Sequence, residues 1–199
     1  MEERELRISA GEALERLKGG NARFVAGSSG HESPTDEARR LELLDGQAPF
    51  AIILGCSDSR VPAEIVFDQG LGDLFVIRVA GNVVAPSLVG SVEFAAESFR
   101  TRLVVVLGHT QCGAVGATLA ELDRPSENRS PNLRSIVDRI RPAVEALLET
   151  DAARDPERLA RQAVRANIRA SVNQLRHGSA ILEKLIEDDG LLVVGAEYS

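Results

Sequence analysis

The sequence predicts an α/β fold in which helices cover both faces of a mainly parallel β-sheet. Four short runs rich in Val, Ile and Leu have the length of buried strands, and helical segments separate them, which is typical of parallel sheets. Metal-ligating side chains directly follow two of these runs, at the strand ends where open α/β sheets bind ligands. We expect the strands at about 51–55, 74–79, 103–107 and 191–195.

The N-terminal part is expected to form two amphipathic helices. Ser9 and Glu12 have the spacing of a capping box, which predicts a helix from about residue 10. Gly19 and Gly20 predict that this helix ends or bends there. A second helix is expected from Thr35 onward. Because each helix has an apolar side to cover, we expect them to pack on the sheet or on a partner subunit.

The rest of the chain alternates strands with helices. Ser87 is a candidate N-cap for a helix over 88–99, and Cys112 and Gly113 begin the next helix. Three more helices are expected, at about 132–148, 156–176 and 179–188.

Length and charge limit the classes of function. The chain has 199 residues and no internal repeat, so we expect a single domain, with an N-terminal helical arm at 1–46 and an α/β core at 47–199. A formal charge of −7 argues against nucleic acids or anionic membranes as partners. No apolar run approaches the ~20 residues needed to cross a bilayer, and no signal peptide follows the charged N-terminus. We therefore expect a cytoplasmic protein.

Two short segments carry the chemistry, Cys56-Ser57-Asp58-Ser59-Arg60 and His109-Thr110-Gln111-Cys112. They contain both cysteines of the chain, and each directly follows a predicted buried strand. Two thiolates and one imidazole from neighbouring strand ends would give Zn²⁺ three protein ligands. A fourth position left open is typical of a catalytic zinc site, whereas structural sites are usually closed.

These two segments together resemble the β-class carbonic anhydrases, and the residues at 61–64, 67–78 and 80–82 resemble the same family. The resemblance implies that Cys56, His109 and Cys112 bind one zinc ion per chain. It also implies reversible hydration of carbon dioxide to bicarbonate and a proton, by attack of a zinc-bound hydroxide on CO₂. Because two thiolates offset the charge of the metal, we predict a rate that rises toward alkaline pH.

The resemblance also assigns roles around the metal. Asp58 would accept a hydrogen bond from the zinc-bound water, and Arg60 would hold Asp58. In some members this Asp turns and closes the site, but those members have a Trp where this chain has Ile53, so we expect the open, active form. The family shares its pocket between two subunits, which implies a homodimer or higher homo-oligomer. The expected substrate-binding residues are Gln47, Phe75, Ala80, Phe94 and Gly113.

Other functions remain open at this point. A zinc hydrolase of CS₂ or COS would use the same site, and a non-catalytic zinc-binding paralogue would keep the ligands alone. The Asp58–Arg60 pair argues against the second, because zinc storage needs neither residue. A phosphatase-type cysteine is disfavoured because that pattern, Cys-x₅-Arg, needs an arginine six positions after the cysteine, and Arg60 follows Cys56 by only four. The glycines of this region do not fit the dinucleotide-binding pattern.

Overall fold

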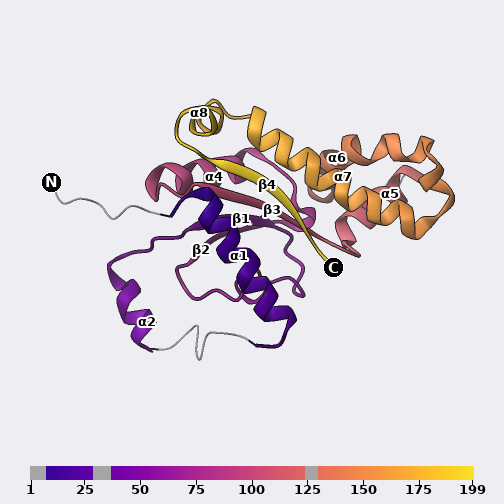
Figure 1. Cartoon of the computed structure of the whole chain (residues 1–199). Coiled ribbons are helices and arrows are strands. Elements are labelled where there is room, and N and C mark those ends of the chain that lie inside the picture. Colours follow the sequence, from indigo (N-terminus) through magenta and orange to yellow (C-terminus); the bar gives the residue numbers. More distant parts are fainter. Residues whose placement is uncertain (1–7, 29–36, 124–129) are drawn as a thin grey trace.

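A computed structural model describes residues 8–28, 37–123 and 130–199. Its centre is a four-stranded sheet of order β2-β1-β3-β4, in which every neighbouring pair is parallel (Figure 1). The predicted fold class is confirmed, although two strands run further than expected, to His109 and Tyr198. The strands are β1 Ala51–Gly55, β2 Leu74–Arg78, β3 Leu103–His109 and β4 Leu192–Tyr198.

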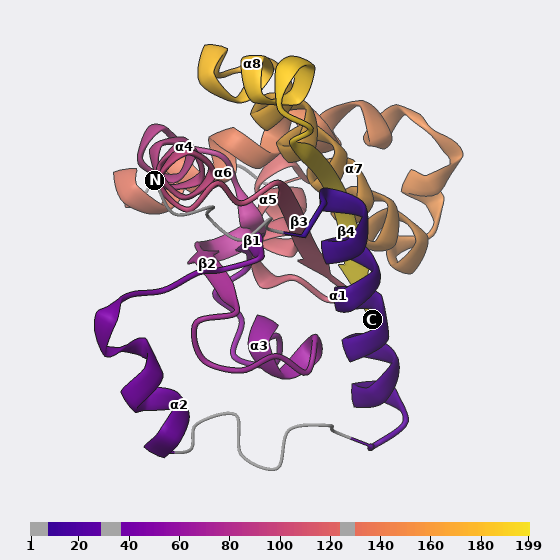
Figure 2. The same cartoon turned by 60° about the vertical axis from the view of Figure 1, so that its left-hand side comes forward.

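Helices lie on both sides of this sheet. In both views α1 and α2 lie on one side, and α4, α7 and α8 lie on the other (Figures 1 and 2). Short 3₁₀ turns connect several elements, including η2 at Ala80–Asn82. The helices are α1 Ala10–Val25, α2 Glu37–Glu42, α3 Ala63–Val66, α4 Pro86–Ser98, α5 Gly113–Asp123, α6 Pro131–Val144, α7 Pro156–His177 and α8 Ala180–Asp188.

Strand β1 shows why the strand sequences are continuously apolar. Ile52 and Leu54 belong to a core that also contains residues of α4 to α8, whereas Ala51 and Ile53 belong to a second core with α1 and α3. Because successive side chains point to opposite faces, a strand covered on both faces buries every residue. All five residues of β1 are buried.

Helix α1 begins as predicted but does not end as predicted. The Ser9 hydroxyl accepts a hydrogen bond from the Glu12 N–H, and the Glu12 carboxylate accepts one from the Ser9 N–H, which completes the capping box. The helix then continues through Gly19 and Gly20 to Val25, so the expected break is wrong. A Cβ at Gly20 would lie 1.8 Å from the carbonyl oxygen of Phe67. Gly20 therefore allows close packing rather than a break.

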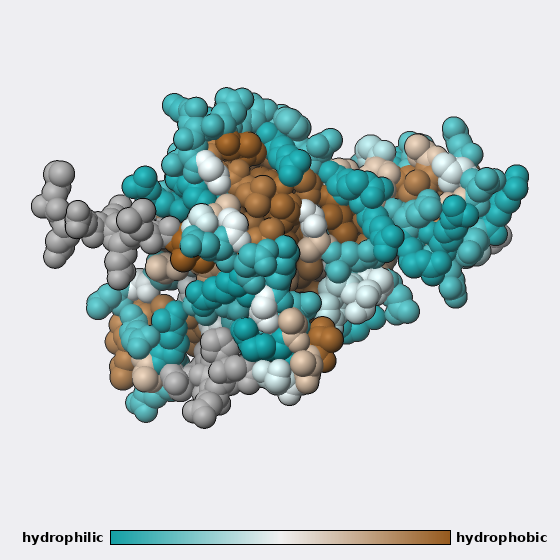
Figure 3. All heavy atoms as spheres, viewed as in Figure 1, coloured by the Kyte–Doolittle hydropathy of each residue, from teal (hydrophilic) through white to brown (hydrophobic). Residues whose placement is uncertain are grey.

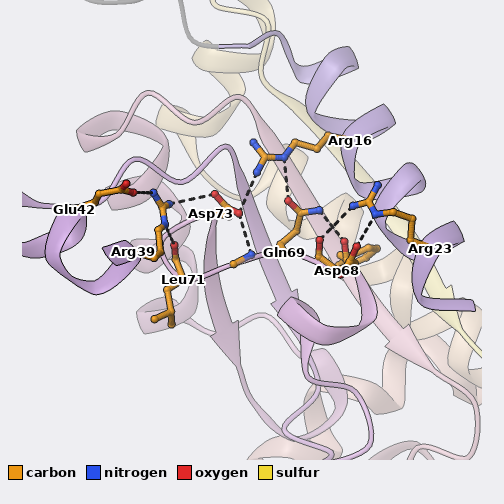
Figure 4. Close-up of polar contacts among 10 residues, drawn as sticks. Arg16, Arg23, Arg39, Glu42, Asp68, Gln69, Leu71 and Asp73 are labelled. Carbon is orange, nitrogen blue, oxygen red and sulfur yellow. Dashed lines mark hydrogen bonds and ion pairs between the residues drawn. The ribbon is translucent and has the colours of Figure 1, made fainter. Parts of the chain in front are cut away.

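Polar contacts tie the N-terminal helices to the loop before β2 (Figure 4). From α1, Arg16 pairs with Asp73 at 3.0 Å and Arg23 pairs with Asp68 at 2.6 Å. From α2, Arg39 lies 3.4 Å from Asp73. Asp73 therefore joins both helices, although no residue of α2 is itself buried.

Two further helices differ from expectation at their ends. Helix α4 starts at Pro86 with Ala85 as its N-cap, so Ser87 is not the cap. Proline suits the first helical turn because its missing N–H has no intrahelical partner there. Helix α6 ends at Val144, and the 3₁₀ turn Glu145–Glu149 follows it. Within the described ranges, no helix has both the length and the apolar composition needed to cross a bilayer.

Candidate metal centre

Three potential metal ligands meet at one edge of the sheet. Cys56 directly follows β1, His109 is the last residue of β3, and Cys112 directly precedes α5. Strands β1 and β3 are paired up to Gly55 and Leu107, so their carboxyl ends lie side by side. All three side chains are buried, and their ligand atoms lie within 4.8 Å of one another. The cluster predicted from the two sequence segments is therefore formed.

The state of His109 fits a metal ligand. Its Nδ1 lies 2.9 Å from the carbonyl oxygen of Thr110, so this nitrogen must donate a hydrogen bond there. In the neutral imidazole the Nε2 atom then carries the lone pair, and this atom is buried without a hydrogen-bond partner among the described residues. One imidazole nitrogen and two cysteine sulfurs form a set of donor atoms that Zn²⁺ prefers. A histidine ligand whose second nitrogen donates to a carbonyl is also the usual arrangement.

A hydrogen bond joins the two cysteine side chains. The Cys112 thiol is hydrogen-bonded to the Cys56 sulfur, which lowers the pKa of Cys56 to about 4 and raises the pKa of Cys112 above its usual range. The backbone N–H of Gly81 also donates to the Cys56 sulfur, at 3.4 Å. A divalent cation that displaced the proton of the Cys112 thiol would be bound by two thiolates.

Asp58 lies beside this cluster and is held by Arg60. The Arg60 Nε donates to Asp58 Oδ1 at 2.9 Å, and the Arg60 Nη2 donates to Asp58 Oδ2 at 2.7 Å. The guanidinium keeps the pKa of the Asp58 carboxyl well below its usual range, so this group only accepts hydrogen bonds. Asp58 Oδ2 lies 3.9 Å from His109 Nε2. The carboxylate is thus near the ligands but fixed by another partner.

Arg78 supports the segment that carries Cys56. From the end of β2, its side chain donates to the carbonyl oxygens of Cys56 at 3.0 Å and Asp58 at 2.6 Å. Arg60 also reaches the carbonyl oxygen of Gln111 at 3.3 Å, which links the two sequence segments. Arg78 lies within the stretch at 67–78 that resembles the family, but these contacts to carbonyl oxygens were not predicted from the sequence.

Four of the five predicted pocket residues fall into two groups. Ala80 adjoins Gly81, whose N–H contacts Cys56, and Gly113 directly follows Cys112, so both lie beside the ligands. Phe75, Phe94 and Phe99 instead form an aromatic cluster next to β2, with ring centres 5.6 to 6.2 Å apart.

Gln47, the fifth predicted pocket residue, lies before the amino end of β1, whereas the ligands lie at the carboxyl end. It is exposed and precedes β1, whereas Cys56 follows the same strand. Because a strand rises ~3.3 Å per residue, the five residues of β1 separate Gln47 from the ligands. Phe94 is 54% exposed, so it too leaves part of its surface uncovered. One chain alone therefore does not gather all the predicted pocket residues.

Comparison with known proteins adds to this geometry. A family model for carbonic anhydrase matches residues 51–199. The chain belongs to the carbonic anhydrase family. A carbonic anhydrase of Mycolicibacterium smegmatis is 52% identical over 132 residues, which cover 66% of this chain and 63% of that protein. Carbonic anhydrase 2 of Mycobacterium tuberculosis strain H37Rv is 40% identical over 188 residues, which cover 94% and 86%.

Solved carbonic anhydrases share the fold. The β-carbonic anhydrase CcaA superposes with a TM-score of 0.72 at 26% identity, over 93% of this chain and 89% of that chain. One of two tetrameric β-carbonic anhydrases from Sordaria macrospora superposes with a TM-score of 0.71 at 24% identity, over 94% and 91%. The family predicted from the sequence is therefore confirmed.

Proposed function

We propose that this chain binds one zinc ion through Cys56, His109 and Cys112 and catalyses the reversible hydration of carbon dioxide to bicarbonate and a proton. The buried two-sulfur, one-nitrogen cluster beside an ion-paired Asp58 supports this proposal most directly. Zinc bound there would supply a Lewis acid that lowers the pKa of a coordinated water.

The Asp58–Arg60 pair would orient the reacting water. An ionised carboxylate can only accept, so a water that donates one proton to Asp58 must direct its lone pair elsewhere, toward the carbon of CO₂. Arg60 occupies both oxygens of Asp58 and so holds the carboxylate away from the ligand position. This arrangement supports the open, active form of the site, and it favours an enzyme over a zinc-storage protein.

A second copy of the chain would complete the substrate pocket. Gln47 cannot reach the metal ligands of its own chain across the length of β1, so a Gln47 that contacts substrate must come from a partner. In the arm at 1–46, Leu41 of α2 (59%) and Leu44 of the 3₁₀ turn that follows it (77%) are exposed, and both need an apolar surface to cover them. We therefore propose a homodimer or higher homo-oligomer in which the N-terminal helices pack on the partner.

The outer strand of the sheet offers a further apolar surface. Leu192, Val194, Ala196 and Tyr198 of β4 are only partly buried, and they face the same side of the sheet as α1. Figure 3 shows hydrophobic surface in this region, and a hollow of about 470 Å³ lies between α1 and β4. Covering this surface would add to the stability of a dimer.

Stopped-flow measurement of CO₂ hydration tests the proposed reaction. Protein that carries one zinc ion per chain should hydrate CO₂ rapidly at pH about 8.5, where a coordinated water is deprotonated. Fully zinc-loaded protein without hydration would contradict the proposal. Hydrolysis of COS or CS₂ by that same sample would then identify the alternative substrates.

A further inference from the structure

The turn η2, Ala80–Asn82, lies against the proposed zinc ligand Cys56. The Gly81 N–H donates to the Cys56 sulfur at 3.4 Å, and Gly81 is buried. The turn has an unusual backbone, because φ is +75° at Gly81 and +44° at Asn82. Residues other than glycine rarely adopt positive φ, and this backbone conformation is kept where contacts with the surrounding structure hold it.

Two side chains of α7 fix this turn. The Asn167 Nδ2 donates to the Gly81 carbonyl oxygen at 2.7 Å, and the Ser171 hydroxyl donates to the Asn82 carbonyl oxygen at 3.0 Å. The two residues are four apart and therefore share one face of the helix. They are 2% and 4% exposed, so water does not compete for these bonds.

Close packing brings α7 within reach of the turn. A Cβ at Gly108 of β3 would lie 2.5 Å from the Ile168 side chain, and one at Gly195 of β4 would lie 2.6 Å from it. These two glycines therefore let α7 pack closely against β3 near its end and against the middle of β4. From the other side, a Cβ at Gly81 would lie 2.8 Å from Ile140 and 2.9 Å from Ala114. The turn is thus packed between α7, α5 and α6.

We propose that Asn167 and Ser171 are positioning residues for the metal centre, which hold η2 so that the Gly81 N–H stays directed at the Cys56 sulfur. This inference rests on the proposed zinc site. A donor directed at a thiolate stabilises its negative charge and fixes the direction in which its remaining lone pairs point. Neither side chain contacts the ligands directly, so both act through the backbone of the turn.

The affinity of the site for metal provides the main test. Asn167→Ala and Ser171→Ala should each weaken zinc binding by ~10- to 100-fold, the usual effect of removing a group that supports a metal ligand. Competition against a chromophoric chelator measures this affinity. In the cobalt-substituted protein, the thiolate-to-cobalt charge-transfer band should also shift. The conservative variant Ser171→Thr keeps the hydroxyl and should bind zinc nearly as the wild type does.

Thr101→Val is a matched control for loss of a buried hydrogen bond. The Thr101 hydroxyl is buried and donates to the Pro49 carbonyl oxygen at 2.7 Å, between the segments that precede β3 and β1. The Thr101→Val substitution therefore removes the same kind of hydrogen bond, but at the edge of the sheet opposite the metal ligands. This variant should melt at a lower temperature but keep wild-type zinc affinity and an unchanged cobalt spectrum.

Four outcomes distinguish the possibilities. In the first, Asn167→Ala and Ser171→Ala lower the melting temperature and yet match Thr101→Val in zinc affinity and cobalt spectrum. Asn167 and Ser171 would then only stabilise the fold, and the inference would be overturned. If Asn167→Ala does not fold, Ser171→Ala with Ser171→Thr decides alone. A wild-type protein that takes up neither zinc nor cobalt overturns both this inference and the proposed zinc site. Wild-type protein that binds zinc without hydrating CO₂ overturns only the proposed activity, because the affinities are measured without substrate.

Discussion

The two ends of β1 differ in how many of the predicted site residues a single chain brings together there. At the carboxyl end, Cys56 is buried with two other ligands, and Asp58, Arg60 and Arg78 are held by contacts from the same chain. At the amino end, Gln47 is exposed and follows the segment that exposes Leu41 and Leu44. This difference is the basis of our proposal that one chain holds the metal and two chains form the substrate pocket.

This difference follows from what each half must do. Three metal ligands need fixed positions within a few ångströms, which two adjacent strand ends and their hydrogen bonds provide. A pocket for CO₂ mainly needs apolar walls that exclude water, and a second subunit can supply these walls. The following predictions test whether the two ends respond separately to substitution.

The largest effect is expected for Cys56→Ser at the carboxyl end. A hydroxyl is a poor zinc ligand compared with a thiolate, so zinc content should fall and CO₂ hydration should drop at least ~10³-fold. Metal analysis and stopped-flow assays measure both quantities. Ser57→Ala, at the exposed neighbouring position, is the control and should leave both unchanged. Normal activity of Cys56→Ser would remove this residue from the ligand set.

Asp58→Asn should have the second largest effect. The amide loses the charge that Arg60 binds and can donate as well as accept, so it no longer enforces one orientation of the reacting water. The hydration rate should fall ~10²-fold while zinc content stays at one ion per chain. Loss of zinc in this variant would instead indicate that Asp58 helps to bind the metal.

Gln47→Ala tests the amino end and should have a smaller effect. It removes one polar contact to substrate, so kcat/KM should fall ~10-fold. Zinc affinity should not change, because the ligands lie at the other end of β1. A variant with wild-type kinetics would exclude Gln47 from the pocket.

The double variant Leu41→Glu/Leu44→Glu should weaken assembly and have the smallest direct effect on the metal centre. Both side chains are exposed in the single chain, so the charges should not unfold it. Light scattering should show a lower mass, and the hydration rate per chain should become concentration-dependent. Leu133→Glu on α6, also at an exposed leucine, is the control. An unchanged mass would show that the segment at 37–45 does not pack on a partner.

The sequence predicts best where the determinants are local. The strands were predictable because each is a short apolar run, and the ligands because two of these runs end in metal-binding residues. The capping box at Ser9 was predictable for the same reason. In each strand, in each ligand-bearing segment and in the capping box, the residues that carry the pattern lie within a few positions of one another.

Features that depend on distant contacts were missed. Gly20 was expected to interrupt α1, yet it packs against Phe67, and such a contact is visible only after folding. The bonds from Asn167 and Ser171 to η2 join residues more than eighty positions apart, so no local pattern indicates them. The order of the strands also depends on long-range pairing. These features can be identified only once the tertiary structure is known.

Subunit mixing tests most directly whether one chain holds the metal while two chains form the pocket. Purified Cys56→Ser and Gln47→Ala proteins are mixed in equal amounts, allowed to exchange subunits, and assayed for CO₂ hydration. In a mixed dimer, the intact Cys56 of one chain would meet the intact Gln47 of the other. With random exchange, activity should rise to roughly a quarter of the wild-type value. Activity that remains at the mean of the two parent variants, after exchange is verified, would contradict a shared pocket.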